Sequence, residues 1–158
     1  MTIELFPRTR EAVITYFNKT QDDEIKKLIP MKAKTVEEAL EDYEKTLSSD
    51  STSYGESIYV DGCHIGDIWC YCIGDEDPDA MLSFCIFEKN MWGQGIAKEV
   101  VRLFLIKAKE KFSLKTVGAF TYAHNISSVR VLLGSGFTEK ETFIENGVES
   151  KYFQLDLI

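Results

Sequence analysis

Residues 81–112 constrain the fold of this chain more than any other part of the sequence. They open with seven nearly all-apolar residues, 81–87, pass through a loop that contains two glycines, and end in a helical pattern at 95–112. In this last part apolar side chains recur four residues apart, and charged side chains occupy the other side, as in an amphipathic helix. A continuous apolar run is typical of a strand covered on both faces. The sequence therefore predicts a buried strand, a glycine loop and a helix that packs on the sheet.

The remaining segments predict helices mainly in the first third of the chain and strands in the middle. Helical spacing and capping residues predict helices at 8–19, 22–29, 35–47 and 125–135. Strand patterns occupy 3–6, 57–60, 64–73, 116–122, 139–145 and 148–157. The pairs Asp61-Gly62 and Asn146-Gly147 suit tight hairpin turns, because glycine tolerates the positive φ that such turns need. We expect an antiparallel meander in the middle of the chain, ending in the strand at 81–87.

Size and composition indicate one globular unit. The 158 residues are 44% hydrophobic and 28% charged, the balance of a folded protein with a sizeable core. No linker rich in Pro, Gly or Ser divides the chain, and no segment repeats at a fixed period. We expect residues 1–158 to form a single domain.

The charge balance and the apolar segments restrict the partners. A net charge of −8 argues against nucleic acid, because phosphate binding needs concentrated Lys and Arg. The same negative field would attract cationic amines. No apolar stretch approaches the roughly 18 residues that span a bilayer, and the first residues lack the basic flank and apolar run of a signal peptide. We expect a cytoplasmic protein with no membrane partner.

The cysteines and histidines do not suggest a metal site. Cys63, Cys70, Cys72 and Cys85 fall in or directly beside predicted strands and form no C-x-x-C pair. His64 and His124 are the two imidazoles, and they are not spaced with other ligands. We interpret the cysteines as small buried side chains in a reducing compartment and predict no metal.

The loop Trp92-Gly93-Gln94-Gly95-Ile96-Ala97 is the first motif that carries chemistry. A helix N-terminus has free N–H donors, and glycines let a phosphate approach the main chain, so the loop is a candidate pyrophosphate site. The alternative is a plain turn between strand and helix. A dinucleotide fingerprint would need a small residue where Lys98 stands, and a P-loop would need Gly-Lys-Ser/Thr, so neither pattern fits.

A second motif lies downstream, and together the two resemble the GNAT N-acetyltransferases. That family carries a Q/R-x-x-G-x-G/A loop, which the sequence matches except that Trp92 replaces the first residue. It also carries Asn-x-x-Ser/Ala before a helix that ends in Gly-Phe, matched by Asn125-Ile126-Ser127-Ser128 and Gly136-Phe137. The resemblance covers essentially the whole chain in element order. The Trp-Gly-x-Gly-x-Ala version is similar to the branch that contains the ribosomal-protein N-terminal acetyltransferases.

The resemblance implies a fold, a co-substrate and its contacts. The fold would be α+β, a mixed and mostly antiparallel central sheet of about seven strands flanked by helices and splayed at strands 4 and 5. Acetyl-coenzyme A would lie in the splay, with the backbone of Cys85, Ile86 and Phe87 pairing with the pantetheine arm near a bulge. The pyrophosphate would bind the loop residues Trp92, Gly93, Gln94, Gly95, Ile96 and Ala97, and Asn125 and Ser128 would reach the cofactor. Asn125 could equally serve as a helix cap.

The implied activity is acetyl transfer to a primary amine by direct attack in a ternary complex, and its proton carriers stay open. Many relatives place a tyrosine where this chain has Leu132. Glu88 is a candidate base, Ser127 and Ser128 are candidate proton donors, and His124 or water are further alternatives. The acceptor could be a protein N-terminus, a small polyamine or an amine-bearing antibiotic. Its binding site would be shaped by residues 20–30 and the 146–147 hairpin. A homodimer is possible.

Two other classes of function remain open on the sequence alone. A degenerate member of the family could bind coenzyme A without catalysis, as a sensor or interaction module. A structural domain with no ligand would use Gly93, Gly95 and Asn125 as turn and cap residues.

Overall fold

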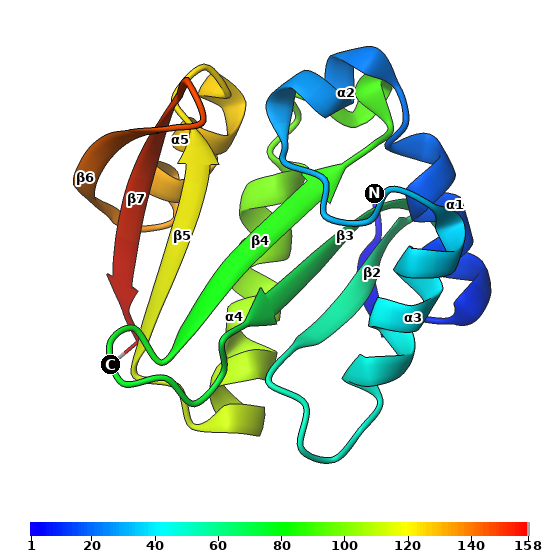
Figure 1. Cartoon of the computed structure of the whole chain (residues 1–158), viewed down its shortest axis with the longest axis horizontal. Helices are drawn as coiled ribbons and strands as arrows, with labels where there is room; N and C mark the ends of the chain where they lie inside the picture. Colours follow the sequence, from blue (N-terminus) through cyan, green and yellow to red (C-terminus); the bar gives the residue numbers. More distant parts are fainter. Residues whose placement is uncertain (158) are drawn as a thin grey trace.

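One mixed sheet of seven strands organises the molecule, in the order β1-β2-β3-β4-β5-β7-β6 (Figure 1). The structure is a computed structural model that describes residues 1–157, and Ile158 of the expected domain lies outside the described residues. The strands are β1 (Ile3–Pro7), β2 (Tyr54–Val60), β3 (Cys63–Tyr71), β4 (Ala80–Ile86), β5 (Thr116–Tyr122), β6 (Thr138–Glu145) and β7 (Val148–Asp156).

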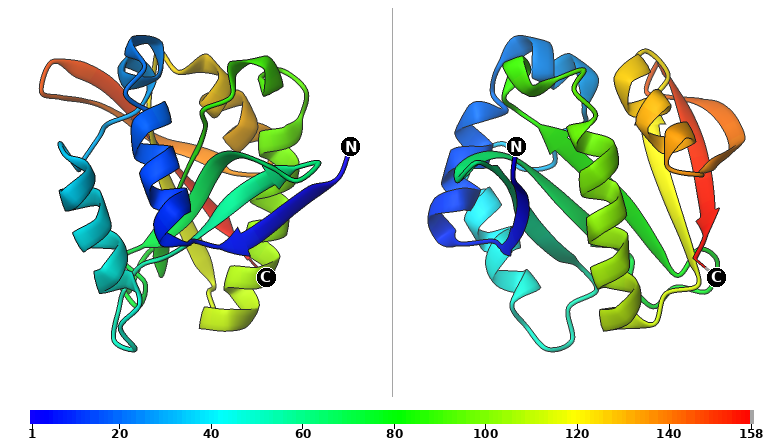
Figure 2. Two further views of the ribbon diagram at one scale, coloured as in Figure 1. Left: turned by 90° about the vertical axis from the view of Figure 1, so that its right-hand side faces the viewer. Right: turned by 180° about the vertical axis from the view of Figure 1, so that it is seen from behind.

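Helices cover both faces of the sheet. They are α1 (Arg10–Lys19), α2 (Asp23–Leu28), α3 (Val36–Thr46), the short 3-10 helix η1 (Lys89–Met91), α4 (Ile96–Phe112) and α5 (Ile126–Gly134). Helices α1 and α3 lie on one face of the β2–β3–β4 half, and α4 and α5 lie on the opposite face (Figure 2). Within residues 1–157, no helix has the length and apolar character to cross a membrane.

The predicted helices and strands are all present, and local chemistry explains where they begin and end. The side chains of Thr9, Asp22, Thr35 and Asn125 accept hydrogen bonds from the first N–H groups of α1, α2, α3 and α5. At the end of α5, Phe137 N donates to Leu132 O at 3.0 Å, and Gly136 has a φ of 96°, as the predicted closing motif requires. Element bounds differ from the sequence prediction by up to three residues, most at the start of β2, which begins at Tyr54 and not at residue 57, and η1 was not predicted.

Strands β4 and β5 diverge, and this divergence opens the sheet. They run parallel and pair through two residue pairs, Ala80 with Val117 and Met81 with Gly118. The other neighbouring strands of the described chain pair in antiparallel fashion over longer registers. The predicted α+β fold, with a mostly antiparallel sheet splayed at strands 4 and 5, is confirmed.

The core between the sheet and α4 fixes where that helix begins. The predicted apolar stripe of α4 is buried: Ile96, Val100, Phe104 and Ala108 are each at most 1% exposed. They pack in one cluster with inward-facing residues of β2, β3 and β4. Burial of each large apolar side chain contributes about 1.5–3 kcal/mol. The helix is therefore anchored along its length, and its N-terminus is held beside the end of β4.

Candidate active site

A cavity of about 530 Å³ lies between the two arms of the sheet, where β4 and β5 have separated. Its walls come from the end of β4, the loop before α4, the beginning of α5 and helix α2. Of the residues proposed from the sequence, it is lined by Cys85, Ile86, Trp92, Gly93, Gly95, Ile96, Ala97, Asn125, Ser127 and Ser128. Phe87, Gln94 and Glu88 are not part of its wall.

The N-terminus of α4 brings free backbone donors to the cavity. Gly95 is the N-cap residue, with a φ of 78° and no side-chain cap. The first hydrogen bond of the helix joins Glu99 N to Gly95 O at 3.3 Å, so the preceding N–H groups have no partner of this kind. A Cβ placed on Gly93 or Gly95 would meet nothing within 4 Å. The site therefore has room for an anion at the positive end of the helix dipole.

Two basic side chains add positive charge to the wall. Lys98 and Arg130 both line the cavity, whereas none of the lining residues is an Asp or Glu. The Lys98 side chain runs beside α5, where a Cβ on Gly134 would lie 3.7 Å from Lys98 Cδ. This charge pattern suits a phosphate-bearing ligand.

Alternate residues of β4 offer backbone groups to the cavity. Phe87 donates its N–H to Ile65 O of β3 at 2.9 Å, so its backbone groups face β3. Those of Ile86 and Phe84 consequently face the opposite edge, toward the splay. The sequence analysis assigned this contact to Cys85, Ile86 and Phe87, but Phe87 is only 5% exposed and packs in a small buried cluster. The alternation of the strand turns the backbone groups of both Cys85 and Phe87 toward β3, so of the three predicted residues Ile86 alone offers its backbone to the splay.

Trp92, at the position where the family motif has Gln or Arg, attaches the loop to β4. Its Nε1 donates to Ile86 O at 2.8 Å, which occupies one of the acceptors on the edge that faces the splay. Gln94 turns away from the cavity, because its Nε2 donates to Asn90 O at 2.6 Å. The loop is therefore anchored at both sides of Gly93.

The end of β4 has the hydrogen-bond pattern of a β-bulge. Phe87 and Glu88 both donate their N–H groups to Ile65 O, at 2.9 and 3.4 Å, so two residues oppose one. The expected bulge lay at residues 85–87, and this pattern falls at its C-terminal end. The Glu88 carboxylate lies 3.6 Å from Lys19 Nζ and outside the cavity wall. The geometry does not favour Glu88 as a base.

Asn125 joins α5 to α2. Its Oδ1 accepts from Ser128 N at 3.2 Å, which caps α5, and its Nδ2 donates to Leu28 O at 3.2 Å. The side chain therefore caps α5, and it also lines the cavity. Leu132, where many relatives place a tyrosine, is 1% exposed in the core.

Helix α2 bridges the two arms of the sheet at the cavity. On the β4 side, Lys89 Nζ lies 2.9 Å from both Asp22 Oδ2 and Glu24 Oε1. Hydrogen bonding to Lys89 lowers the pKa of Asp22. On the β5 side, α2 is held through its carbonyls by Asn125 and His124. Three apolar residues of this segment complete the wall: Ile25, Leu28 and Ile29.

His124 is the group of the cavity wall best suited to proton transfer near neutral pH. Its Nε2 lies 2.5 Å from Lys27 O, and because a carbonyl only accepts, Nε2 carries the proton. The neutral ring then has its lone pair on Nδ1. Burial raises the pKa of the Cys85 thiol to about 12, so this thiol is a poor nucleophile. Residues 1–157 contain no group of three or more His, Cys, Asp or Glu that could hold a metal ion.

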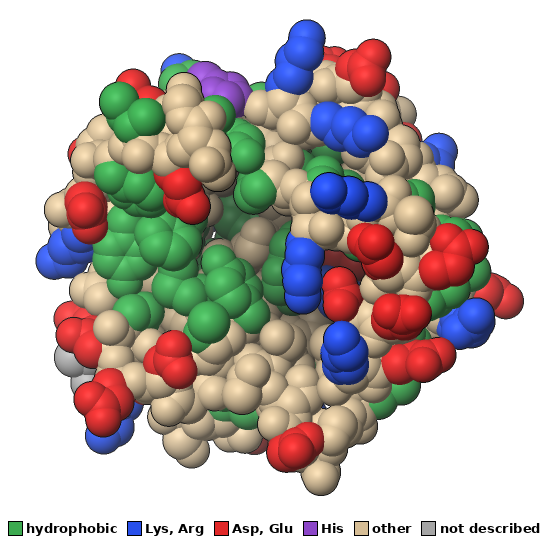
Figure 3. Space-filling model, viewed as in Figure 1, with side chains coloured by type: hydrophobic (Ala, Val, Ile, Leu, Met, Phe, Trp, Pro, Cys, Tyr) green, Lys and Arg blue, Asp and Glu red, His purple; other side chains and the backbone are tan. Residues whose placement is uncertain are grey.

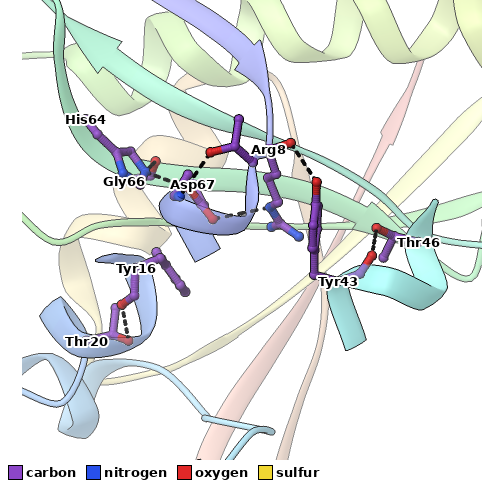
Figure 4. Close-up of polar contacts among 10 residues, drawn as sticks. Arg8, Tyr16, Thr20, Tyr43, Thr46, His64, Gly66 and Asp67 are labelled. Carbon is purple, nitrogen blue, oxygen red and sulfur yellow. Dashed lines mark hydrogen bonds and ion pairs between the residues drawn. The ribbon is translucent and has the colours of Figure 1, made fainter. Parts of the chain in front are cut away.

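A buried polar cluster supports β4 from the α1 side (Figure 4). Asp67, 2% exposed, accepts from His64 Nε2 at 2.9 Å and pairs with Arg8 Nε at 3.2 Å. The same His64 nitrogen faces Gly66 O at 3.0 Å, so both of its neighbours are acceptors and it carries the proton. Asp67 lies opposite Cys85 in the strand register. The buried carboxylate therefore has one hydrogen bond, from His64, and one ion pair, with Arg8, to compensate its charge.

Sequence reasoning missed the wall residues that reach the cavity through tertiary structure. Lys98 was used to argue against a dinucleotide motif, although a lysine one turn into the helix after the glycine loop was itself a signal. Arg130 gave a comparable signal, because it is a basic residue in the helix predicted to begin at Asn125. Ile25 of α2 had none, because a short amphipathic segment does not reveal which strand edge it will cover.

The comparison with known families agrees with this geometry. The sequence matches the family described as acetyltransferase (GNAT) domain over residues 3–138. Because that match spans most of the chain, the chain belongs to this family. A comparison with curated protein sequences finds no match.

Solved structures share the fold over nearly the whole chain. RimL, a ribosomal L7/L12 alpha-N-protein acetyltransferase in complex with coenzyme A, has a TM-score of 0.83 at 14% identity, covering 99% of this chain and 94% of that chain. A spermidine N-acetyltransferase from Vibrio cholerae, with coenzyme A and spermine, has a TM-score of 0.82 at 18% identity, with coverages of 98% and 95%. An aminoglycoside acetyltransferase with coenzyme A has a TM-score of 0.81 at 13% identity, with coverages of 99% and 95%. At these identities the likeness shows the fold.

Proposed function

We propose that the protein transfers an acetyl group from acetyl-coenzyme A to a primary amine, by direct attack in a ternary complex. The observation that carries the proposal is the cavity in the splay, which combines the uncapped N-terminus of α4 with Lys98 and Arg130. Family membership supports an acyltransferase. The similar structures include coenzyme A complexes of enzymes named for a ribosomal protein, spermidine and aminoglycosides, all of which carry amines.

The proposed binding mode assigns each wall of the cavity to one part of the co-substrate. Gly93, Gly95 and the first N–H groups of α4 hold the pyrophosphate, with Lys98 and Arg130 near the phosphates. The backbone edge of β4 at Phe84 pairs with the pantetheine arm as an added strand would. Cys85, Ile86, Asn125 and Ser128 form the adjoining walls.

The proposed reaction needs little besides positioning. The amine nitrogen bonds to the thioester carbonyl carbon, the C–S bond then breaks, and the products are an amide and the free thiol of coenzyme A. Binding both reactants in one complex lowers the entropic part of the barrier. N–H groups on the free edge of β4 stabilise the oxyanion. His124 Nδ1 or water takes the proton of the amine, and Ser127 or Ser128 returns one to the thiolate, whose pKa of roughly 8.5 calls for little assistance.

The rival function is a coenzyme A sensor that does not catalyse, and two measurements separate it from an enzyme. Thermal unfolding with coenzyme A measures binding, and thiol release from acetyl-coenzyme A with a panel of amines measures transfer. Stabilisation together with amine-dependent thiol release supports the enzyme. Stabilisation without release for any amine supports the sensor, and no stabilisation at millimolar ligand contradicts both.

The proposal extends to the setting of the reaction. It treats residues 1–158 as one acetyltransferase domain that works in the cytoplasm on a small-molecule or peptide amine, with neither nucleic acid nor membrane as a partner. The net charge of −8 supports a cationic acceptor over a phosphate polymer. Sedimentation of the purified protein tests whether it forms a homodimer.

A further inference from the structure

The face of the sheet opposite α5 is aromatic and uncovered on the β5–β7–β6 arm. The space-filling view shows apolar surface gathered over these three strands, beside the hollow in the middle of the molecule (Figure 3). Phe120 is 51% exposed, although it lies in the middle of β5. Its ring centroid lies 5.1 Å from that of Tyr152 on β7 and 5.7 Å from that of Phe143 on β6. These three side chains are called here the aromatic platform.

The aromatic platform continues into the cavity along β5. Tyr122 follows Phe120 on the same face of the strand, because side chains alternate with a period of two. Its ring stacks on His124 at 5.3 Å, and His124 lines the cavity. On the β4 side the wall extends down to Phe84, which the parallel register places level with residue 121. The platform therefore begins at the level where the cavity ends.

The carboxylates that share this face lie around the aromatic platform. By the strand registers, Glu141 and Glu145 of β6 and Asp156 of β7 are on the same face as the three rings. Carboxylates at this border attract a cationic amine. The exposed aromatic rings between them favour an apolar or aromatic group. The face therefore suits an amine on an apolar body.

The cavity wall further favours an amine that is easily deprotonated. No Asp or Glu lines it, so the described wall offers no carboxylate base. At pH 7 roughly one in ten α-amines of pKa near 8 is neutral, against roughly one in 2,500 lysine-type amines of pKa near 10.4. A site that depends on positioning gains most from an acceptor of the first kind.

Resting on the proposed acetyl transfer, we infer that the acceptor is the α-amino group of a peptide whose first residue has an aromatic or branched aliphatic side chain. That side chain packs on the aromatic platform while the amine enters the cavity at the level of Phe84. Phe120, Tyr152 and Phe143 then determine specificity. The exposed rings explain selection for the side chain, and the wall without carboxylates explains selection for an α-amine.

The test compares peptide amides that differ only in their first residue, Phe, Leu, Ser or Asp, in the thiol-release assay with the full chain. Spermidine, an aminoglycoside and phenethylamine complete the panel. Phe and Leu peptides are expected to exceed the Ser peptide by about tenfold or more in kcat/KM. Phe120→Ser is expected to reduce the Phe-over-Ser ratio to less than about threefold, through a higher KM for the Phe peptide.

Ile144→Ser is the matched control, because Ile144 is 76% exposed on the same hairpin and lies opposite Glu149, off the platform face. It should leave the ratio unchanged. Phe143→Ser replaces Phe120→Ser if that variant unfolds. Equal rates for all peptides, a preference for spermidine, the aminoglycoside or phenethylamine, or an equal loss in Ile144→Ser would overturn the inference.

Two further outcomes are distinct. If Phe120→Ser dissociates a dimer in sedimentation and keeps the ratio, the aromatic platform joins two copies of the chain, and the inference is overturned. If coenzyme A stabilises the protein but no amine on the panel releases thiol, the proposed acetyl transfer itself fails. Transfer to amines without apolar preference would contradict only the inference about the acceptor.

Discussion

The two arms of the sheet are covered differently. The β2–β3–β4 arm has α1 and α3 on one face and α4 on the other, whereas the β5–β7–β6 arm has α5 on one face and the bare aromatic platform on the other (Figure 2). A strand buried on both faces holds its backbone edge in a fixed place, as a binding site for a pantetheine arm requires. An uncovered face can instead accept variable side chains. The covered arm is the proposed cofactor side, and the bare arm selects the acceptor.

The largest effect is expected from a change that breaks the covered arm. Gly66 of β3 approaches β4 so closely that a Cβ would lie 2.2 Å from Cys85 O. Gly66→Val should therefore separate the strands and lower the free energy of unfolding by about 3 kcal/mol. Denaturant unfolding followed by circular dichroism measures the loss. Gly134→Ala is the control, because a Cβ there meets only the Lys98 side chain at ordinary contact distance, and this variant should be as stable as the parent or more so.

The second prediction places proton transfer on the β5 side of the cavity. His124→Gln keeps an amide that can donate to Lys27 O but removes the basic Nδ1. If His124 takes the proton, turnover should fall by about a hundredfold and the acidic limb of the pH profile should vanish. Glu88→Gln on the β4 side should cost less than about threefold, because Glu88 pairs with Lys19 outside the wall. If Glu88→Gln instead lost more turnover than His124→Gln, the base would be Glu88 on the β4 side.

The third prediction concerns the loop at the end of the covered arm. Gly95→Val places a branched side chain where the phosphate is proposed to approach the main chain, so the Kd for coenzyme A should rise by about tenfold or more. Gly147→Val is matched to it, because the two glycines have φ values of 78° and 77° and both would place a Cβ in open space. The backbone strain is then similar, and affinity should change in Gly95→Val alone. Equal affinities of Gly95→Val and Gly147→Val for coenzyme A, measured by calorimetry, would show that the loop is not part of the cofactor site.

The covered arm could be predicted from the sequence more completely than the bare one, because its determinants are local. The glycine loop directly precedes α4, so motif and element boundary coincide. Gln94 shows the limit of this reasoning, since its place in the motif did not reveal that its side chain turns to Asn90. The aromatic platform could not be predicted from the sequence, because Phe120 and Phe143 come together only when β7 lies between β5 and β6.

The contact between α2 and α5 depends on tertiary structure in the same way. His124 and Lys27 are 97 residues apart in the chain, and no local sequence pattern predicts their hydrogen bond. The predicted capping role of Asn125 was accessible from its position before a helix, whereas its bond to Leu28 O was not. Sequence reasoning therefore identified Asn125 and its capping role, but not its contact with α2.

The smallest effect is expected at this residue, where the two roles can be separated. Asn125→Ala removes both the cap of α5 and the hydrogen bond to Leu28 O, and loss of the cap alone should cost about 1 kcal/mol of stability. Asn125→Asp keeps an oxygen that accepts from Ser128 N but cannot donate to Leu28 O. If the bond to α2 holds the cavity wall in place, both variants should weaken coenzyme A binding while only Asn125→Ala loses the capping energy. Unfolding and calorimetry on the same samples measure the two quantities. Unchanged affinity in Asn125→Asp would mean that the bond to Leu28 O is not needed to hold the wall, and that Lys89 on the β4 side and His124 on the β5 side are sufficient to place α2.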